Sequence, residues 1–344
     1  MPTIRQVAKA CGVSPMTVSF VLNNKPGQVS KETRVRVLKT VREMGYRPTA
    51  VDIAAENRQV FTLGVVAGVP GESLAEPGYY SVILHAILAA ADRLGQCLTV
   101  LPDSLLHKDP HQSIRVYCDG RCDGLLVIAP LIGNTLVTAL KERGIPMVLV
   151  GDPGDDNTFV SADIDNLRES CRAVEYLIDQ GHTRIAFLGG YHLVRSASLR
   201  RDGYRMALER RGLAFDASLE CSGIFRETEI ETHVRALMTP ESGMPPTALF
   251  LWSDQVLAPV MRTLHEMNLR VPEDVSVIGF DDGPLAATID PPVTTMRQPY
   301  REIAIQAVEM LLAQIQEPAA VITKTLLPTE LVVRSSVGPP RAQG

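Results

Sequence analysis

The chain has 344 residues, of which 45% are hydrophobic and 21% are charged, a composition typical of folded globular proteins that excludes wholesale disorder. Its net charge of −5 hides an asymmetry, because residues 1–60 hold 10 Lys and Arg against 4 Asp and Glu while the rest is strongly acidic. A basic head on an acidic body predicts a polyanionic partner for the head alone.

The chain shows no signal for export or membrane insertion. The segment Met1 to Lys9 has no apolar stretch like that of a signal peptide. The longest uncharged run, Gly124 to Leu140, has 17 residues and contains a proline, so it is too short and too broken to span a membrane. Six cysteines without a dense spacing pattern are typical of reduced thiols. We therefore expect a cytoplasmic protein that has no membrane partner.

The first two predicted helices form a helix-turn-helix. Thr3 begins the first helix with a capping-box pattern, Gly12 ends it, and Ser14 caps a second helix that runs to about Leu22. The second helix of such a motif presents its first turn to base edges in the major groove, and nearby hydroxyls and amides bind phosphates. The hydroxyl cluster that favours this use is Ser14, Thr17 and Ser19.

Ser30 caps a third predicted helix, which Gly45 ends. Its apolar face is predicted to consist of Val35, Leu38, Val41 and Met44. Three short helices with basic outer faces predict a DNA-binding head, with a small helical bundle that binds no ligand as the alternative.

After about residue 60, apolar strands alternate with amphipathic helices. Strands are expected at 62–66, 97–101, 124–129, 146–151, 184–189, 248–252 and 276–280, and helices at 80–94, 167–180, 199–211, 255–267 and 301–316. This alternation predicts parallel sheets covered on both faces. Seven such units exceed one doubly wound domain, so we expect an α/β body of two lobes.

Side chains that follow these strands predict a binding site, because ligands of open parallel sheets bind at the carboxyl ends of the strands. Tyr79 and Tyr80 open the first long helix, where their rings are suited to stack on a ligand or to pack in the core. Trp252 and Asp254 follow another strand, and Asp254 is equally suited to cap the next helix. A cleft between the lobes is the expected site.

Enzymatic and metal sites are weaker interpretations. A zinc site would require His107, His111, Cys118 and Cys122, but Pro110 breaks the helix that would align the histidines. The chain has no Gly-x-Ser-x-Gly elbow, no phosphate-binding loop with lysine and no His-Glu-x-x-His motif. We expect no catalytic residue, no metal and no cofactor, and an enzyme is a poor alternative.

These motifs resemble the LacI/GalR (lactose-repressor) family of bacterial transcription regulators over nearly the whole chain. The resemblance continues through Val29–Arg34, Gly45–Pro48, Asp123–Val127, Gly181–Gly190, Val271–Asp282, Thr294–Pro299 and Pro328–Arg334. It implies a helix-turn-helix head (1–47), a hinge (48–60), a body like periplasmic sugar-binding proteins (61–338) and a tail (339–344). The lobes would comprise about 61–162 plus 298–325, and 163–297 plus 326–338.

The resemblance implies DNA contacts residue by residue. Pro15, Met16 and Phe20 occupy base-reading positions. Phe20 departs from the family, which often has Arg or His there, and it offers only apolar contact, for example with a thymine methyl. The alternative is that Phe20 packs inward. Phosphate or sugar contacts are implied for Thr3, Ser14, Thr17, Asn23, Ser30, Thr33 and Arg34.

The hinge departs further from the family, whose members usually carry Ala-Arg-x-Leu with the leucine as a minor-groove wedge. The equivalent stretch here is Asp52 to Ala55, in which Ala55 is too short to open a base step and Asp52 repels phosphate. Ile53 and Val51 are the substitute wedges. We expect a weakened hinge contact, with unimpaired docking of a hinge helix as the alternative.

In the body, Ser196 and Arg200 resemble a family Ser/Thr-xxx-Arg pair whose arginine binds a ligand oxygen, and Asp281 matches a family acid. We expect Arg200 and Asp281 to face each other across the cleft, which suits a polyol such as a sugar. The resemblance implies a ligand-responsive repressor. A homodimer is expected because one head offers a small interface and the chain lacks a C-terminal heptad segment. A purine-dependent or other corepressor-dependent regulator and a solute-binding protein are the alternatives.

Overall fold

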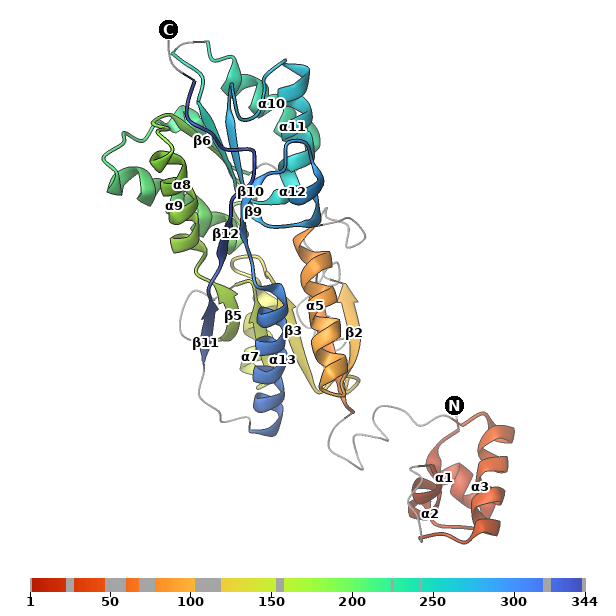
Figure 1. Ribbon diagram of the computed structural model, residues 1–344. Helices are drawn as coiled ribbons and strands as arrows, with labels where there is room; N and C mark the ends of the chain where they lie inside the picture. The colour runs from red at the N-terminus through yellow and green to blue at the C-terminus, as the bar shows by residue number, and fades with distance from the viewer. Residues whose placement is uncertain are drawn as a thin grey trace. The chain divides into compact units, whose positions relative to one another are not determined.

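The computed structural model describes residues 2–22, 28–46, 60–67, 78–102, 119–152, 158–223, 226–241, 243–317 and 323–341. The chain divides into two compact units, Met1–Val60 and Phe61–Gly344, called here the head and the body (Figure 1). Within the described residues, no helix has the length and apolar character needed to cross a membrane. Predicted site residues outside them are Asn23, Val51, Asp52, Ile53, Ala55, His107, His111 and Cys118.

The head contains the three predicted helices, α1 (Ile4–Cys11), α2 (Pro15–Leu22) and α3 (Lys31–Met44). The capping box at α1 is present, because the Thr3 amide donates to the Gln6 side chain (2.8 Å) and the Gln6 amide donates to the Thr3 hydroxyl. The helices enclose one small core, made of Val7, Ala8, Cys11, Val18, Val21, Val37 and Tyr46.

Two predictions about the head are wrong in part. On α3, Val41 and Met44 pack against the head core as expected, but Val37 completes this face, and the expected Val35 and Leu38 are 68% and 36% exposed. Ser19 is only 8% exposed, because it lies between Val18 and the inward-facing Val21 on α2. Its hydroxyl is therefore not part of an exposed cluster.

The first sheet of the body is parallel throughout, with the strand order β11-β5-β4-β3-β1-β2. Two helices, α5 (Tyr79–Arg93) and α13 (Tyr300–Gln316), pack together on this sheet, and α7 (Thr135–Glu142) belongs to a separate core cluster (Figure 1). Leu126 packs in the cluster that contains α5 and α13, whereas its neighbours Leu125 and Val127 pack with α7, as the alternation of strand side chains requires. We call this sheet and its three helices lobe 1. Its strands are β1 (Thr62–Ala67), β2 (Cys97–Pro102), β3 (Gly124–Ile128), β4 (Met147–Val150), β5 (Val160–Ile164) and β11 (Lys324–Leu327).

The second sheet has the order β12-β10-β9-β8-β6-β7 and forms lobe 2. All its pairs are parallel except β10 with β12, so the predicted parallel architecture fails only at this edge strand. Its strands are β6 (Ile185–Leu188), β7 (Glu220–Cys221), β8 (Ala248–Leu251), β9 (Ser276–Asp281), β10 (Thr294–Arg297) and β12 (Glu330–Val332). Its helices are α8 (Asn166–Asp179), α9 (Arg195–Arg210), α10 (Glu227–Met238), α11 (Leu257–Glu266) and α12 (Pro284–Thr288), with 3-10 turns η2 (Ala217–Leu219) and η3 (Asp254–Val256).

The chain passes between the two lobes three times, after β5, after β10 and after β11. Each passage is short: Asp165, Gln298-Pro299 and Pro328-Thr329 separate the flanking elements. Strand β5 continues to Ile164 and β11 to Leu327, two residues beyond the lobe boundaries expected at 162 and 325. The carboxyl ends of strands from both sheets therefore lie near the passages.

Candidate functional site

A pocket lies between the lobes at the carboxyl ends of their parallel strands. Its empty volume, mouth included, is about 430 Å³. Six of the seven residues predicted to bind an effector line it: Tyr79, Tyr80, Ser196, Arg200, Trp252 and Asp281. The other lining residues are Ala129, Gly151, Asp163, Asn166, Val194, Ser253, Gln255 and Gln298.

Arg200, on α9, is 3% exposed and is held by several acceptors. Its Nη1 donates to Asp281 Oδ1 (3.1 Å) and to the Trp252 carbonyl (2.5 Å), and its Nε donates to Asn166 Oδ1 (2.9 Å). The guanidinium carbon lies 3.8 Å from the centroid of the Phe280 ring, a cation–π distance. The guanidinium is thus fixed in one orientation at the pocket wall.

The expectation that Arg200 and Asp281 face each other across the cleft is wrong. Both residues come from lobe 2 and form a buried ion pair on one wall. The reason is topological, because α9 follows β6 and Asp281 ends β9, and the two parallel strands end at the same edge of one sheet. The acid that lobe 1 supplies to the pocket is Asp163, at the end of β5.

Asp281 lies on a strained strand end. Its φ is 114° and that of Asp282 is 57°, in the left-handed region that costs a non-glycine residue about 1–3 kcal/mol. The Asp281 carboxylate accepts hydrogen bonds from Ser253 Oγ (2.6 Å) and Gln298 Nε2 (2.6 Å) in addition to Arg200. These donors hold the carboxylate in place at the pocket.

Asp254 does not line the pocket that the described residues form. It accepts hydrogen bonds from the backbone on both sides of Asp281 and so supports this strand end. Its carboxylate accepts from the backbone amides of Phe280 (3.0 Å) and Gly283 (3.0 Å), and from the Thr295 hydroxyl (3.1 Å). Burial and the charge of Asp281 raise the pKa of Asp254 well above its usual value. Asp254 is therefore placed as a support for the strained turn.

Asp254 does not cap the next helix, which was its expected alternative role, because the neighbouring Ser253 does so. Ser253 is the N-cap of η3, and its hydroxyl accepts from the Gln255 amide (3.2 Å). The absence of a side chain at Gly279 leaves room for the Asp254 carboxylate, because a Cβ there would lie 2.0 Å from Asp254 Oδ1.

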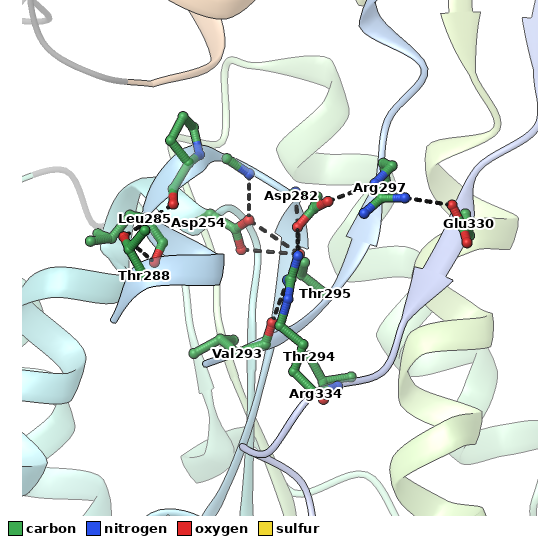
Figure 2. A network of polar contacts seen from close by, with 12 residues as sticks. Asp254, Asp282, Leu285, Thr288, Val293, Thr294, Thr295, Arg297, Glu330 and Arg334 are labelled. Atoms are coloured by element: carbon green, nitrogen blue, oxygen red, sulfur yellow. Dashed lines mark hydrogen bonds and ion pairs between the residues drawn. The ribbon is translucent and has the colours of Figure 1, made fainter. Parts of the chain in front are cut away.

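A second polar network lies around Asp282, next to Asp281 in the chain (Figure 2). Asp282 accepts from Arg297 Nε (2.7 Å) on β10 and from Arg334 Nη2 (2.6 Å), which follows β12. Arg297 also donates to Glu330 (2.8 Å) on β12. The network joins three neighbouring strands beside the strained strand end and so fixes the start of its turn.

Two polar groups of lobe 1 face the pocket with few protein partners. The Tyr79 hydroxyl is buried and has no hydrogen-bond partner within the described residues. It lies against Gly151, where a Cβ would come within 2.0 Å of the hydroxyl oxygen. Asp163 accepts from Asn166 Nδ2 (3.0 Å), and burial raises the pKa of the Asp163 carboxyl to about 7 although Arg200 acts in the opposite direction. Lobe 1 offers these two groups to a ligand in the pocket.

Several pocket residues carry no clear signal in the sequence, for physical reasons that the structure identifies. Asp163 and Asn166 flank the end of β5, a strand that its polar residues concealed. Ser253 and Gln255 surround the predicted Asp254 and point the other way. The signal for Gln298 was available, since it follows a strand within the motif Thr294–Pro299.

The head presents most of its predicted DNA contacts on its surface. Thr3, Ser14, Pro15, Met16 and Ser30 are exposed, and Thr17, Phe20, Thr33 and Arg34 are half-buried. Phe20 is half-buried and does not belong to the core that the described residues of the head form. Hydroxyl pairs begin two helices, because Ser14 Oγ lies 2.9 Å from Thr17 Oγ1 and Ser30 Oγ donates to Thr33 Oγ1 (3.0 Å).

The chain matches known proteins over nearly its full length. Family profiles match residues 3–49 (bacterial regulatory proteins, lacI family) and 174–337 (periplasmic binding protein-like domain). The HTH-type transcriptional repressor PurR of Vibrio vulnificus is 32% identical over 340 residues, which are 98% of this chain and 99% of that protein. The PurR of Aliivibrio fischeri (strain MJ11) is also 32% identical, over 98% of each chain.

Solved structures of transcription regulators are also similar to this chain over nearly its full length. The lac repressor dimer bound to operator and the anti-inducer ONPF has a TM-score of 0.78 at 28% identity, covering 98% of this chain and 99% of that one. A CelR–cellobiose complex has a TM-score of 0.72 at 29% identity, covering 98% and 100%. Because the 32% identity to a repressor extends over nearly the whole of both chains, this chain belongs to the lacI family of bacterial regulatory proteins.

Proposed function

We propose that this protein is a transcriptional repressor whose head binds operator DNA and whose DNA affinity changes when a small molecule occupies the pocket between the lobes. The observation that carries the proposal is the combination, in one chain, of a helix-turn-helix head and a pocket that both sheets line. Its relatives are named as repressors, not enzymes.

The head supplies groups that suit DNA. We infer that α2 enters the major groove and that phosphate or sugar is contacted by Thr3, Ser14, Thr17, Ser30, Thr33 and Arg34, a proposal supported by their exposed or half-buried positions. One head is a small interface, so we infer a homodimer on paired half-sites. The lac repressor structure, itself a dimer on its operator, supports this inference. Such a protein acts in the cytoplasm, where the DNA is.

The pocket suits a polyol, and we infer a sugar or sugar derivative as its ligand. Tyr79 and Trp252 offer aromatic faces, and the Tyr79 hydroxyl and the Asp163 carboxyl group offer hydrogen bonds to ligand hydroxyls. Arg200 and Asp281 add a donor and an acceptor on the opposite wall. The CelR–cellobiose complex supports a sugar, whereas the identity to PurR makes a purine the second candidate.

A gel-shift titration tests the proposal, using the DNA upstream of the gene and a panel of sugars, nucleosides and purine bases. We expect Arg200→Ala and Asp281→Ala to bind this DNA like the wild type and to lose the response to the active compound. Losing a charge-assisted hydrogen bond costs about 1.5–3 kcal/mol, more than tenfold in ligand affinity.

A matched control is Arg211→Ala, which breaks an exposed ion pair with Asp179 at the end of α9 and leaves the pocket intact. It should respond like the wild type. A cooperative thermal transition of the body, followed by the fluorescence of Trp252 in lobe 2, shows that each variant has folded. A protein that binds a sugar without binding DNA would instead be a solute-binding protein, and a wild-type response from both pocket variants would refute the site.

A further inference from the structure

The outward face of α2 is apolar. The helix Pro15–Leu22 contains no charged and no amide side chain. Val18 and Val21 point into the head core, while Pro15 and Met16 are exposed and Phe20 is half-buried outside that core. Met16, at 66% exposed, and Phe20 are four residues apart and therefore lie on the same face of the helix.

The polar groups at the start of α2 are bonded to each other. Ser14 Oγ lies 2.9 Å from Thr17 Oγ1 and also accepts the Thr17 amide (3.1 Å). The exposed cations of the head come from the other helices, among them Arg5 and Lys9 on α1 and Lys31 on α3. Charge for phosphate is thus supplied around α2, and the face of α2 itself is left to Met16 and Phe20.

An apolar helix face in the major groove disfavours base pairs whose hydrogen-bonding groups it covers without pairing them. Every base pair presents hydrogen-bonding groups there, and covering them with a thioether or a ring leaves them unpaired at a cost. The apolar group among these base edges is the 5-methyl of thymine. Building on the proposed function, we propose that α2 recognises its operator through thymine methyl groups, which pack against Met16 and Phe20.

The test begins with an operator selected from random-sequence DNA by the full-length protein. Each thymine is then replaced by deoxyuridine, which removes the methyl group and leaves all hydrogen-bonding groups in place. Each contacted methyl should contribute about fourfold in affinity, the equivalent of one buried methylene, and symmetric half-sites should multiply the effect. Replacing a sensitive T·A pair by 5-methylcytosine·G should preserve most of the affinity, whereas unmethylated C·G should weaken binding at least as much as deoxyuridine.

Two variants of Met16 test its role, with Val35→Ala as the control. Met16→Ala should reduce the penalty for deoxyuridine at one position, while Val35→Ala, an equally exposed apolar residue on α3, should leave it unchanged. Met16→Gln keeps the side-chain length and adds an amide, so a fresh selection should shift the preferred base at that position to adenine.

The results separate the two proposals. An enriched operator that binds equally well with deoxyuridine at every position overturns methyl recognition and leaves the repressor function standing. The same penalty in wild type and Met16→Ala overturns the role of Met16. A selection that enriches no sequence contradicts both this inference and the proposed function.

Discussion

Replacing Asp163 by asparagine should stabilise the folded protein, and more so at alkaline pH. Asp163 is 1% exposed at the end of β5 and receives a hydrogen bond from Asn166 Nδ2 at 3.0 Å. Burial raises the pKa of its carboxyl from 3.8 to about 7. Asparagine has nearly the same shape and its carbonyl accepts the same hydrogen bond, so the substitution removes the charge and little else.

The sign follows from proton linkage. Between pH 3.8 and about 7 the folded protein keeps a proton on Asp163 that the unfolded chain has released, so stability falls as pH rises through this window. A pKa difference of about 3 corresponds to about 4 kcal/mol at pH 8, an upper value because the pocket relaxes. The gain from Asp163→Asn should grow by about 2–3 kcal/mol between pH 5 and pH 8.

Denaturant titrations at pH 5 and pH 8 measure this gain, with fluorescence of Trp252, the only tryptophan of the chain, as the signal. Asp274→Asn is the control with the opposite sign, because hydrogen bonds from Arg270 lower the pKa of Asp274 to about 2. That carboxylate stabilises the fold above pH 3.8, so its loss should destabilise the protein at both pH values. If Asp163→Asn destabilises the protein equally at pH 5 and pH 8, the carboxyl is ionised in the folded state and the reasoning is refuted.

Four other predictions concern separate parts of the chain. Operator affinity should fall with salt with a log–log slope of roughly −5 or steeper, as release of at least about six counterions requires, and a slope near zero would contradict DNA binding by the head. Burial lowers the pKa of His182 below 6.5, so the stability that neutral His182 contributes is complete above pH 6.5 and is lost as pH falls. The variant His182→Gln should therefore lose this pH dependence of the melting temperature. A melting temperature that depends on pH as in the wild type would contradict the prediction. Tyr79→Phe should preserve or raise thermal stability, since it removes a buried hydroxyl with no partner in the described residues, and should weaken effector binding; a lower melting temperature would contradict this. The protein should bend its operator less than the ~20–90° kinks of wedge-inserting proteins, and a sharp kink in a circular-permutation assay that survives Ile53→Ala and Val51→Ala would disprove the weakened hinge.

Strands made of continuous apolar residues were predicted from the sequence, and strands without such a run were missed. All seven were found within a residue of their predicted bounds at each end, because continuous runs such as Gly124–Ile128 are buried on both faces. Strand β5 reads Val-Ser-Ala-Asp-Ile and was missed, since Ser161 and Asp163 interrupt its apolar run although all five residues are buried. Strands β11 and β12 lie at sheet edges, where half-exposed residues leave no continuous apolar run.

The candidate site likewise contains residues that the sequence predicts and contacts that it does not. Residues at strand ends, such as Trp252 and Asp281, were predictable because topology fixes where parallel strands end. That Arg200 pairs with Asp281 on one wall, and that Asp163 opposes them from lobe 1, depends on which strands are neighbours, and sequence spacing does not contain this information. Half of the α3 face was misassigned for a simpler reason: Val35 and Val37 both fit an apolar helical stripe that includes Val41, and packing against α1 and α2 selects Val37.

The return of the chain to lobe 1 affects the order in which the protein is completed during synthesis. Helix α13 and strand β11 belong to lobe 1 but follow all of β6–β10, and Ile303, Ala307 and Leu311 of α13 are fully buried beside α5 (Figure 1). A nascent chain that ends near residue 298 therefore has five lobe 1 strands with an apolar face still uncovered, although these strands emerged first. The head does not depend on later segments in this way, because its core, as far as the structure describes the chain, is made of residues between 4 and 46. A truncated product would carry a competent DNA-binding head on an aggregation-prone body, so complete translation is itself a condition for a usable repressor.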